Sequence, residues 1–299
     1  MKKRNLAAAA MSGILAAAML AGIPVYAEGT TEAAEETEIT TEAAEAAEET
    51  EAEGTGEGGP LESIKEKGKL VVGTASGYPP YEFIDITSAN QDIVGIDMEL
   101  AQAIADKLGV ELEIQDMNFT SLISSIPTHK VDMAIAGISI TEERKETMDF
   151  SEPYLEAEQK MLILSENADK YKTLEDFSGE TVAAEKSTTQ ETVCQELLTD
   201  SPLVSLEKVP DCLMELQNGK VAGVMVENIV GEQYVIAYDN IVFSDAETGK
   251  LKTSAVAMDK GNEDLMEIVN EVIKENQENG NFDKWVEEYS EKAASNAQQ

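Results

Sequence analysis

Histidine, arginine, cysteine and tryptophan are the scarce residues of this chain. Its 299 residues include two arginines, two cysteines, one histidine and one tryptophan. The lone histidine, His129, lies in a polar turn at 127–130, so we expect it to be exposed to solvent rather than catalytic. No histidine and cysteine cluster has metal-ligand spacing, and no Gly-x-Ser-x-Gly motif is present. We therefore expect no catalytic residue, no metal and no cofactor.

Basic residues are far outnumbered by acidic ones. The chain has 22 Lys+Arg against 59 Asp+Glu, which gives a formal net charge of −37. A protein with this charge repels the phosphates of nucleic acid and the surface of anionic membranes. We therefore expect no nucleic acid among its partners.

The N-terminus has the pattern of an export signal. A basic start at 2–4 precedes an apolar, alanine-rich run at 6–25, and the residues up to Ala27 resemble a cleavage site. We predict a signal peptide over 1–27 and a mature chain that starts at Glu28 outside the cytoplasm, in the periplasm, on the cell surface or secreted. No cysteine follows the apolar run to carry a lipid. Because an uncleaved run of this length can span a bilayer, a membrane tether is the alternative.

The segment 28–59 is dominated by Glu, Thr, Ala and Gly. It holds twelve glutamates and no lysine. Its apolar content is almost entirely alanine, which is too little to offset the entropy lost on ordering the chain. We predict a disordered acidic linker before a folded part that begins near Pro60.

Strand-like and helix-like patterns alternate after the linker. In 97–108 the apolar residues recur at helical spacing, with Asp97 placed to cap the helix start and Gly109 to end it. The other strand-like and helix-like runs lie at 69–73, 111–115, 131–136, 161–164, 181–184, 190–198, 203–209, 211–218, 222–226 and 265–289. This alternation predicts an α/β fold with parallel sheets, arranged as two lobes rather than one barrel.

The two cysteines fall on consecutive helices of the second lobe. Cys194 lies in 190–198 and Cys212 in 211–218. If the strand order reverses at the first strand of this lobe, right-handed crossovers put the two helices on opposite faces of the sheet. A disulfide is the alternative, but this geometry favours two free and mostly buried thiols.

Arg144 is the one arginine outside the signal segment. The loop 137–140 follows the expected strand 131–136 and precedes a helix whose N-cap is Thr141. The loop therefore lies at the carboxyl end of a parallel strand, where α/β sheets bind ligands. Backbone N–H groups at a helix start favour an anion, and an arginine binds a carboxylate with two parallel hydrogen bonds. These features predict a carboxylate site, with the Ser139 hydroxyl beside it.

Five motifs occur together in a defined order. They are GTASGYPPYEF at 73–83, GIDMEL at 95–100, GISITEER at 137–144, KSTTQE at 186–191 and GNEDL at 261–265. In order and spacing they resemble the polar amino acid-binding proteins, extracytoplasmic solute receptors of ABC importers known as solute-binding protein family 3. The resemblance covers about residues 61–290.

The resemblance implies a two-lobed, periplasmic-binding-protein-like fold. The chain would cross between the lobes near 154–159 and 250–254. Lobe one would comprise 61–153 plus 255–299, and lobe two 160–249. The resemblance also implies a monomer that closes on a free amino acid, with a polar side chain favoured, and delivers it to the membrane permease of an ABC importer.

Ligand contacts are implied as well. Arg144 would hold the α-carboxylate, helped by the backbone N–H groups of Ser139 and, across the cleft, of Thr189 next to Thr188. The Gly137 carbonyl and the Ser139 hydroxyl would take the α-ammonium. The aromatic residues placed against the ligand side chain would be Tyr78 and Phe119.

The chain departs from the family pattern at the ammonium partner. Glu227 stands where members commonly have an aspartate counter-ion, and it is one methylene longer. Ala75 stands where some members carry an acidic residue that meets the ligand side chain. Glu185 is placed to reach the pocket from lobe two, where it would suit an amide or a cationic side chain.

Two other functions stay open at this point. One is an enzyme on the same fold, such as a prephenate- or arogenate-type dehydratase, because a fold does not determine a function. The other is a sensory module that passes its ligand state to a separate receptor.

Overall fold

The structure is a computed structural model that describes residues 59–297. The predicted signal peptide, the membrane tether and almost all of the predicted linker lie outside the described residues. Within 59–297, no helix combines the length and the apolar character that crossing a bilayer requires.

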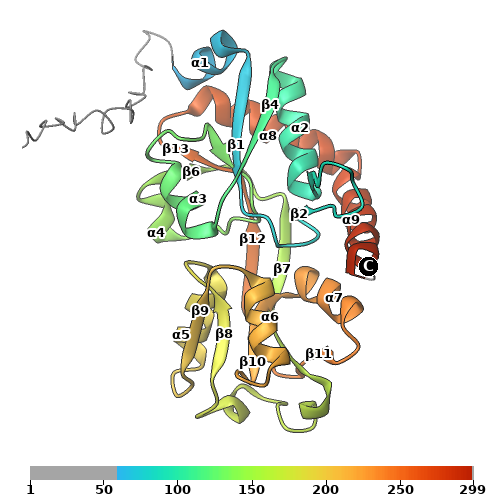
Figure 1. Cartoon of the computed structure of the whole chain (residues 1–299). Coiled ribbons are helices and arrows are strands. Elements are labelled where there is room, and N and C mark those ends of the chain that lie inside the picture. Colours follow the sequence, from blue (N-terminus) through green and yellow to red (C-terminus); the bar gives the residue numbers. More distant parts are fainter. Residues whose placement is uncertain (1–58, 298–299) are drawn as a thin grey trace, which may run out of the picture. The chain divides into compact units, whose positions relative to one another are not determined.

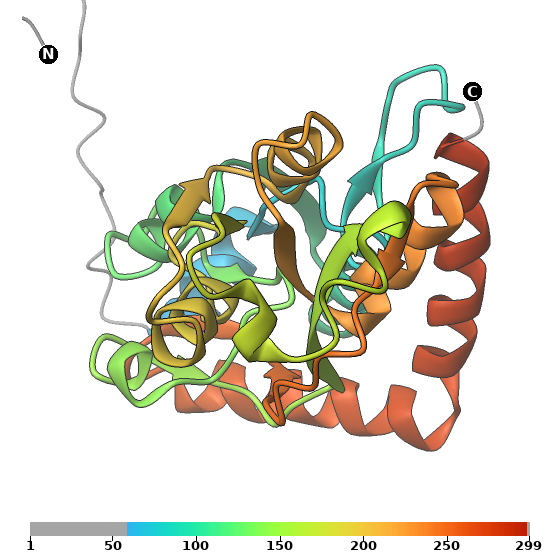
Figure 2. The same ribbon diagram turned by 90° about the horizontal axis from the view of Figure 1, so that it is seen from below.

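The first lobe is built on a five-stranded sheet with the order β4-β1-β5-β13-β6 (Figure 1). Its strands are β1 (Lys69–Thr74), β4 (Glu111–Asp116), β5 (Met133–Ala134), β6 (Met148–Phe150) and β13 (Ala257–Asp259). β1 is parallel to β4 and β5, whereas β13 is antiparallel to β5 and β6. The helices packed around it are α1 (Pro60–Lys67), α2 (Ile96–Leu108), α3 (Phe119–Ser125), α4 (Glu142–Lys145), α8 (Glu263–Glu278) and α9 (Asn281–Ala297). A view from below shows α8 and α9 along two adjacent sides (Figure 2).

The second lobe is built on a sheet with the order β11-β7-β10-β8-β9, in which β12 pairs with β7. Its strands are β7 (Leu155–Leu164), β8 (Val182–Glu185), β9 (Leu203–Leu206), β10 (Gly223–Glu227), β11 (Ile241–Phe243) and β12 (Leu251–Ser254). The parallel part, β9-β8-β10, has the helices α5 (Thr189–Leu197) and α6 (Val209–Gln217), and α7 (Asn228–Ala237) follows β10. Smaller elements are the hairpin β2 (Phe83–Ile84) and β3 (Ile93–Val94), and the 3₁₀ turns Ser165–Asn167 and Leu174–Phe177.

Two paired strands join the lobes. β7 leaves the first lobe and β12 returns toward it, and the two pair antiparallel from Leu155↔Ser254 to Glu158↔Leu251 (Figure 1). The predicted α/β class, with two lobes and two crossing segments, is confirmed. The lobe boundaries given from the sequence stay a prediction.

Helix α2 shows how tertiary contacts override a local signal. Its apolar stripe is buried, as expected, and Gly109 ends it with a φ of 71°. The predicted cap at Asp97 is wrong, because the helix begins at Ile96 after Gly95. The Asp97 carboxylate points inward and accepts hydrogen bonds from the Gly137 N–H at 2.7 Å and the Tyr154 hydroxyl at 2.8 Å. These two buried donors require an acceptor, so the Asp97 carboxylate binds them instead of capping the helix.

Both cysteines are free and buried, which confirms the prediction. Cys212 on α6 belongs to the core that contains Val224, whereas Cys194 on α5 belongs to the core that contains Met225. Since consecutive residues of a strand point to opposite faces, the two helices cover opposite faces of the sheet.

Candidate functional site

A pocket lies between the two lobes. The residues that line it are Ala75, Tyr78, Glu82, Phe119, Ala136, Gly137, Ser139, Arg144, Glu185, Thr188, Thr189, Gln190 and Lys252. The first lobe contributes the segments around Tyr78 and Ser139, the second contributes the start of α5, and β12 contributes Lys252. Of the ten residues named from the sequence, the structure brings nine together here and leaves out Glu227.

The Arg144 loop has the local structure that the sequence predicts. The Thr141 hydroxyl accepts a hydrogen bond from the Arg144 N–H at 3.1 Å and caps α4. The guanidinium donates to the Ser139 carbonyl at 2.8 Å and to the Ser187 carbonyl, on the other lobe, at 2.9 Å. It also lies over the Phe119 ring, 5.2 Å from the centroid. Burial lowers its pKa to about 10, so it is charged at neutral pH.

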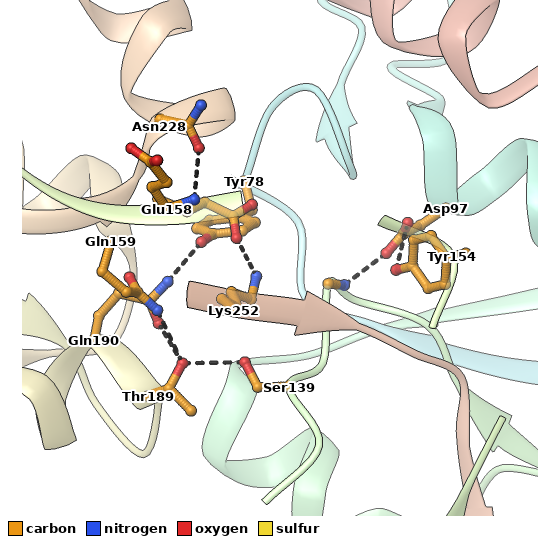
Figure 3. Close-up of polar contacts among 12 residues, drawn as sticks. Tyr78, Asp97, Ser139, Tyr154, Glu158, Gln159, Thr189, Gln190, Asn228 and Lys252 are labelled. Carbon is orange, nitrogen blue, oxygen red and sulfur yellow. Dashed lines mark hydrogen bonds and ion pairs between the residues drawn. The ribbon is translucent and has the colours of Figure 1, made fainter. Parts of the chain in front are cut away.

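Hydrogen bonds close the pocket across the lobes. The Ser139 and Thr189 hydroxyls are 3.0 Å apart, and the Gln190 amide donates to the Tyr78 hydroxyl at 2.9 Å (Figure 3). Farther out, Lys208 donates to the Ser76 carbonyl at 2.8 Å. These contacts describe a closed cleft.

Three carboxyl groups in or next to the pocket hold their protons unusually tightly, of which Glu82 and Asp97 are buried and Glu185 is half-buried. Burial, reinforced by the nearby Asp97, raises the pKa of Glu82 well above its ordinary range. Burial raises the pKa of Asp97 to about 6, although the Gly137 N–H and the Tyr154 hydroxyl oppose the rise. Burial raises the pKa of Glu185 to about 8. Asp97 is therefore largely ionised at neutral pH, whereas a positive partner would favour the ionised forms of Glu82 and Glu185.

Lys252 was not among the residues named from the sequence as site residues. Its ammonium lies 2.5 Å from the Glu227 carboxylate, and its side chain is 3% exposed. It also lies 5.1 Å from the centroid of the Tyr78 ring and 5.2 Å from that of Tyr81. Glu227 is fully buried and does not line the pocket, whereas its partner Lys252 does. The role of Glu227 as the counter-ion of a ligand ammonium stays a prediction.

The other lining residues missed from the sequence are Glu82, Ala136 and Gln190. Glu82 and Ala136 lie in or beside the motifs already quoted, and Gln190 follows Thr189 at the start of α5, so proximity to those motifs was an available signal. Lys252 had no such signal, because its partner is distant in the sequence. His129 is exposed at 67% of its side chain, as expected, and lies 3.5 Å from Asp259.

The comparison with known proteins identifies the family. Residues 70–292 match the bacterial extracellular solute-binding proteins, family 3. The chain belongs to this family, as the motifs implied.

Three similar proteins are amino acid-binding proteins. The arginine-binding extracellular protein ArtP of Bacillus subtilis (strain 168) is 33% identical over 223 residues, which cover 73% of this chain and 84% of ArtP. The L-cystine-binding protein TcyJ of Escherichia coli (strain K12) is 28% identical over 231 residues, which cover 76% and 86%. A solved structure of AbpA from Streptococcus pneumoniae Canada MDR_19A, an amino acid ABC transporter substrate-binding protein bound to L-arginine, superposes with a TM-score of 0.76 at 36% identity. The match covers 78% of this chain and 99% of AbpA.

Proposed function

We propose that this protein is the extracytoplasmic substrate-binding component of an amino acid ABC importer. The observation that carries the proposal is Arg144. Within residues 59–297, its guanidinium is held at a closed cleft by two backbone carbonyls, which orient it without neutralising its charge. A guanidinium in this state attracts a carboxylate, the group that all amino acids share.

The start of α5 supports the same ligand. The first N–H groups of a helix have no partner within the helix, and Thr189 at the start of α5 lies against Ser139. Arg144 and these N–H groups hold the α-carboxylate from both lobes. The bound ligand thereby stabilises the closed state, which the membrane permease recognises.

The α-ammonium needs partners other than Glu227. The Gly137 carbonyl and the Ser139 hydroxyl accept its hydrogen bonds. The negative charge comes from Glu82 or Glu185, which loses its proton when the ammonium arrives, because a nearby positive charge favours the ionised form.

The protein acts as a monomer outside the cytoplasm and passes its amino acid to the permease. The export signal predicted at 1–27 and the extracellular family support this location, and the description of AbpA as an ABC transporter component supports this partner. A tether by an uncleaved 6–25 run is a variant of the same function.

A thermal-shift screen against the standard amino acids tests the proposal. A ligand that binds the folded protein raises its melting temperature by mass action, so we expect at least one amino acid to do so. The matched control is the amine that corresponds to that amino acid without its carboxylate, which we expect to cause no shift. The proposal fails if no amino acid stabilises the protein, or if the amine stabilises it equally.

An enzyme is the second candidate, and one observation favours it. Burial raises the pKa of Glu82 and raises that of Glu185 to about 8, and carboxyl groups with raised pKa values can act as general acids. Incubation with prephenate or arogenate, followed by detection of an aromatic product, tests this alternative. The binding proposal expects no product.

A further inference from the structure

Lys252 is surrounded by groups that bind cations. Its ammonium is paired with Glu227 and lies beside the rings of Tyr78 and Tyr81. It also favours the charged forms of the pocket-lining Glu82 and Glu185, against the effect of burial on both. Two aromatic faces and three carboxyl groups from both lobes form what we call the cation subsite: Tyr78, Tyr81, Glu82, Glu185 and Glu227.

Such a set of groups is what a binding protein needs to hold a positively charged ligand side chain. Ammonium and guanidinium groups are attracted to the faces of aromatic rings and pair with buried carboxylates. Here the chain supplies the cation itself. Figure 3 shows Lys252 beside Tyr78, within the network of bonds that joins the lobes.

Lys252 is held firmly in this position. Neither Glu227 oxygen has a hydrogen-bond partner within the described residues, so the Lys252 ammonium is the charge that compensates this buried carboxylate. Moving the lysine away would leave a buried carboxylate alone, which is strongly unfavourable. The ammonium also fills the space beside the loop, because a Cβ added at Gly137 would lie 3.2 Å from it.

We propose that Lys252 permanently occupies the cation subsite, so that this protein rejects amino acids with a basic side chain and accepts uncharged ones. The inference rests on the proposed function and names its ligand class. It sets this chain apart from the arginine-binding protein ArtP and from AbpA, whose structure holds L-arginine.

The balance of charges in the pocket also favours amino acids with an uncharged side chain. Glu227 compensates Lys252, and the ligand carboxylate compensates Arg144. The ligand ammonium requires one further carboxylate, from Glu82 or Glu185. A basic side chain would require the other acid to ionise too, although burial opposes this and Lys252 already fills the space.

Calorimetry with three forms of the full mature chain tests the inference. For the wild type, we expect serine, threonine or asparagine to bind at least about tenfold more tightly than arginine or lysine. Lys252→Ala empties the cation subsite, so we expect this variant to gain arginine or lysine binding of at least about tenfold over the wild type. Lys252→Met is the matched control. It removes the charge but keeps the space filled, so we expect no such gain.

The outcomes separate the inference from the proposed function. Wild-type affinity for arginine or lysine equal to or above that for uncharged amino acids overturns the inference and leaves the importer function intact. An equal gain in Lys252→Ala and Lys252→Met, or none in Lys252→Ala, also overturns it. If the wild type binds no amino acid, the proposed function fails, whereas a gain confined to Lys252→Ala still supports the role of Lys252.

The Lys252→Ala variant also carries a stability readout. Removal of the lysine leaves Glu227 buried without its ion-pair partner, so we expect a lower melting temperature that arginine or lysine raises by more than serine does. A melting temperature that neither basic amino acid raises contradicts an emptied cation subsite. If the variant does not fold, the wild-type measurements alone decide the inference.

Discussion

The cleft holds two cationic side chains with opposite electrostatic surroundings. Lys252 lies 2.5 Å from the Glu227 carboxylate, and its charge is compensated inside the protein. Among residues 59–297, the hydrogen bonds from the Arg144 guanidinium go to the carbonyls of Ser139 and Ser187. Carbonyls orient a guanidinium but leave its charge available. We infer that a cation in a pocket is available to a ligand only where the fold has not already neutralised its charge.

We expect the largest effect when the ion pair of Lys252 and Glu227 is broken. Glu227→Gln leaves the Lys252 ammonium buried without a counter-ion, and loss of one partner of a buried ion pair costs about 3–5 kcal/mol of unfolding free energy. Urea unfolding measures this loss of unfolding free energy. Because the cost comes from the remaining charge, the double variant Glu227→Gln with Lys252→Met should recover most of the loss. An unchanged midpoint in the single variant would contradict a structural role for the pair.

We expect the next largest effect when Arg144, the cation without a carboxylate partner, is removed. Arg144→Ala removes the partner of the ligand carboxylate, so we expect the affinity for the amino acid found in the screen to fall by about 2–5 kcal/mol. Calorimetry measures this loss. Arg144→Lys keeps the charge but not the fork of donors, and should recover only part of the affinity. Equal affinities for the wild type and Arg144→Ala would remove Arg144 from the site.

A smaller effect concerns the protonated acid beside Lys252. Burial raises the pKa of Glu185 from 4.5 to about 8 in the folded state. The folded state therefore binds this proton more tightly than the unfolded state. Its contribution to stability is complete below the unfolded pKa and is lost as the pH rises through the folded pKa. We expect Glu185 to lower the unfolding free energy by about 1–3 kcal/mol between about pH 5 and about pH 8.

Glu185→Gln isolates this contribution. Urea unfolding across that pH range should give a flatter curve for the variant, because the remaining slope comes from groups such as Asp97 and Glu82. Identical slopes for the two proteins would show that Glu185 has an ordinary pKa in the folded state.

We expect the smallest effect from loss of an uncharged hydrogen bond across the cleft. Tyr78→Phe removes the hydroxyl that accepts a hydrogen bond from Gln190 across the cleft. We expect ligand affinity to fall by about 1 kcal/mol, which is the ordinary worth of one hydrogen bond. His129→Ala, at an exposed position outside the pocket, should leave the affinity unchanged and serves as the control. A loss larger than that of Arg144→Ala would contradict the expected order of the Tyr78 and Arg144 effects.

The Arg144 site and the Lys252–Glu227 pair also differ in how far the sequence predicts them. The Arg144 site is local: the loop after β5, the Thr141 cap and the arginine are within a few residues of each other, and short-range rules describe them. The pair of Lys252 and Glu227 depends on the alignment of β10, β7 and β12, which no local pattern contains.

Asp97 and the unpredicted helix α7 show the same limit. The sequence around Asp97 resembles a helix cap, but the carboxylate binds a backbone N–H and a hydroxyl from distant segments. Helix α7 begins directly after Glu227 and has no side-chain cap to mark its start. Elements with a local signal, such as α2 and the cap of α4, were predicted, and those that depend on tertiary partners were not.

The pairing of β7 with β12 has a consequence for the order in which a ligand meets the protein. Glu227 pairs with Gln159 of β7, and Lys252 pairs with Ala157 of the same strand, so both belong to one continuous ladder. When the lobes separate, we expect this ion pair to move together with the second lobe, while Arg144 stays on the first. Under the proposed function, an incoming carboxylate would then meet the neutral ion pair on the second lobe and the positive Arg144 on the first. We expect the first lobe to bind the carboxylate and the second lobe to enclose it.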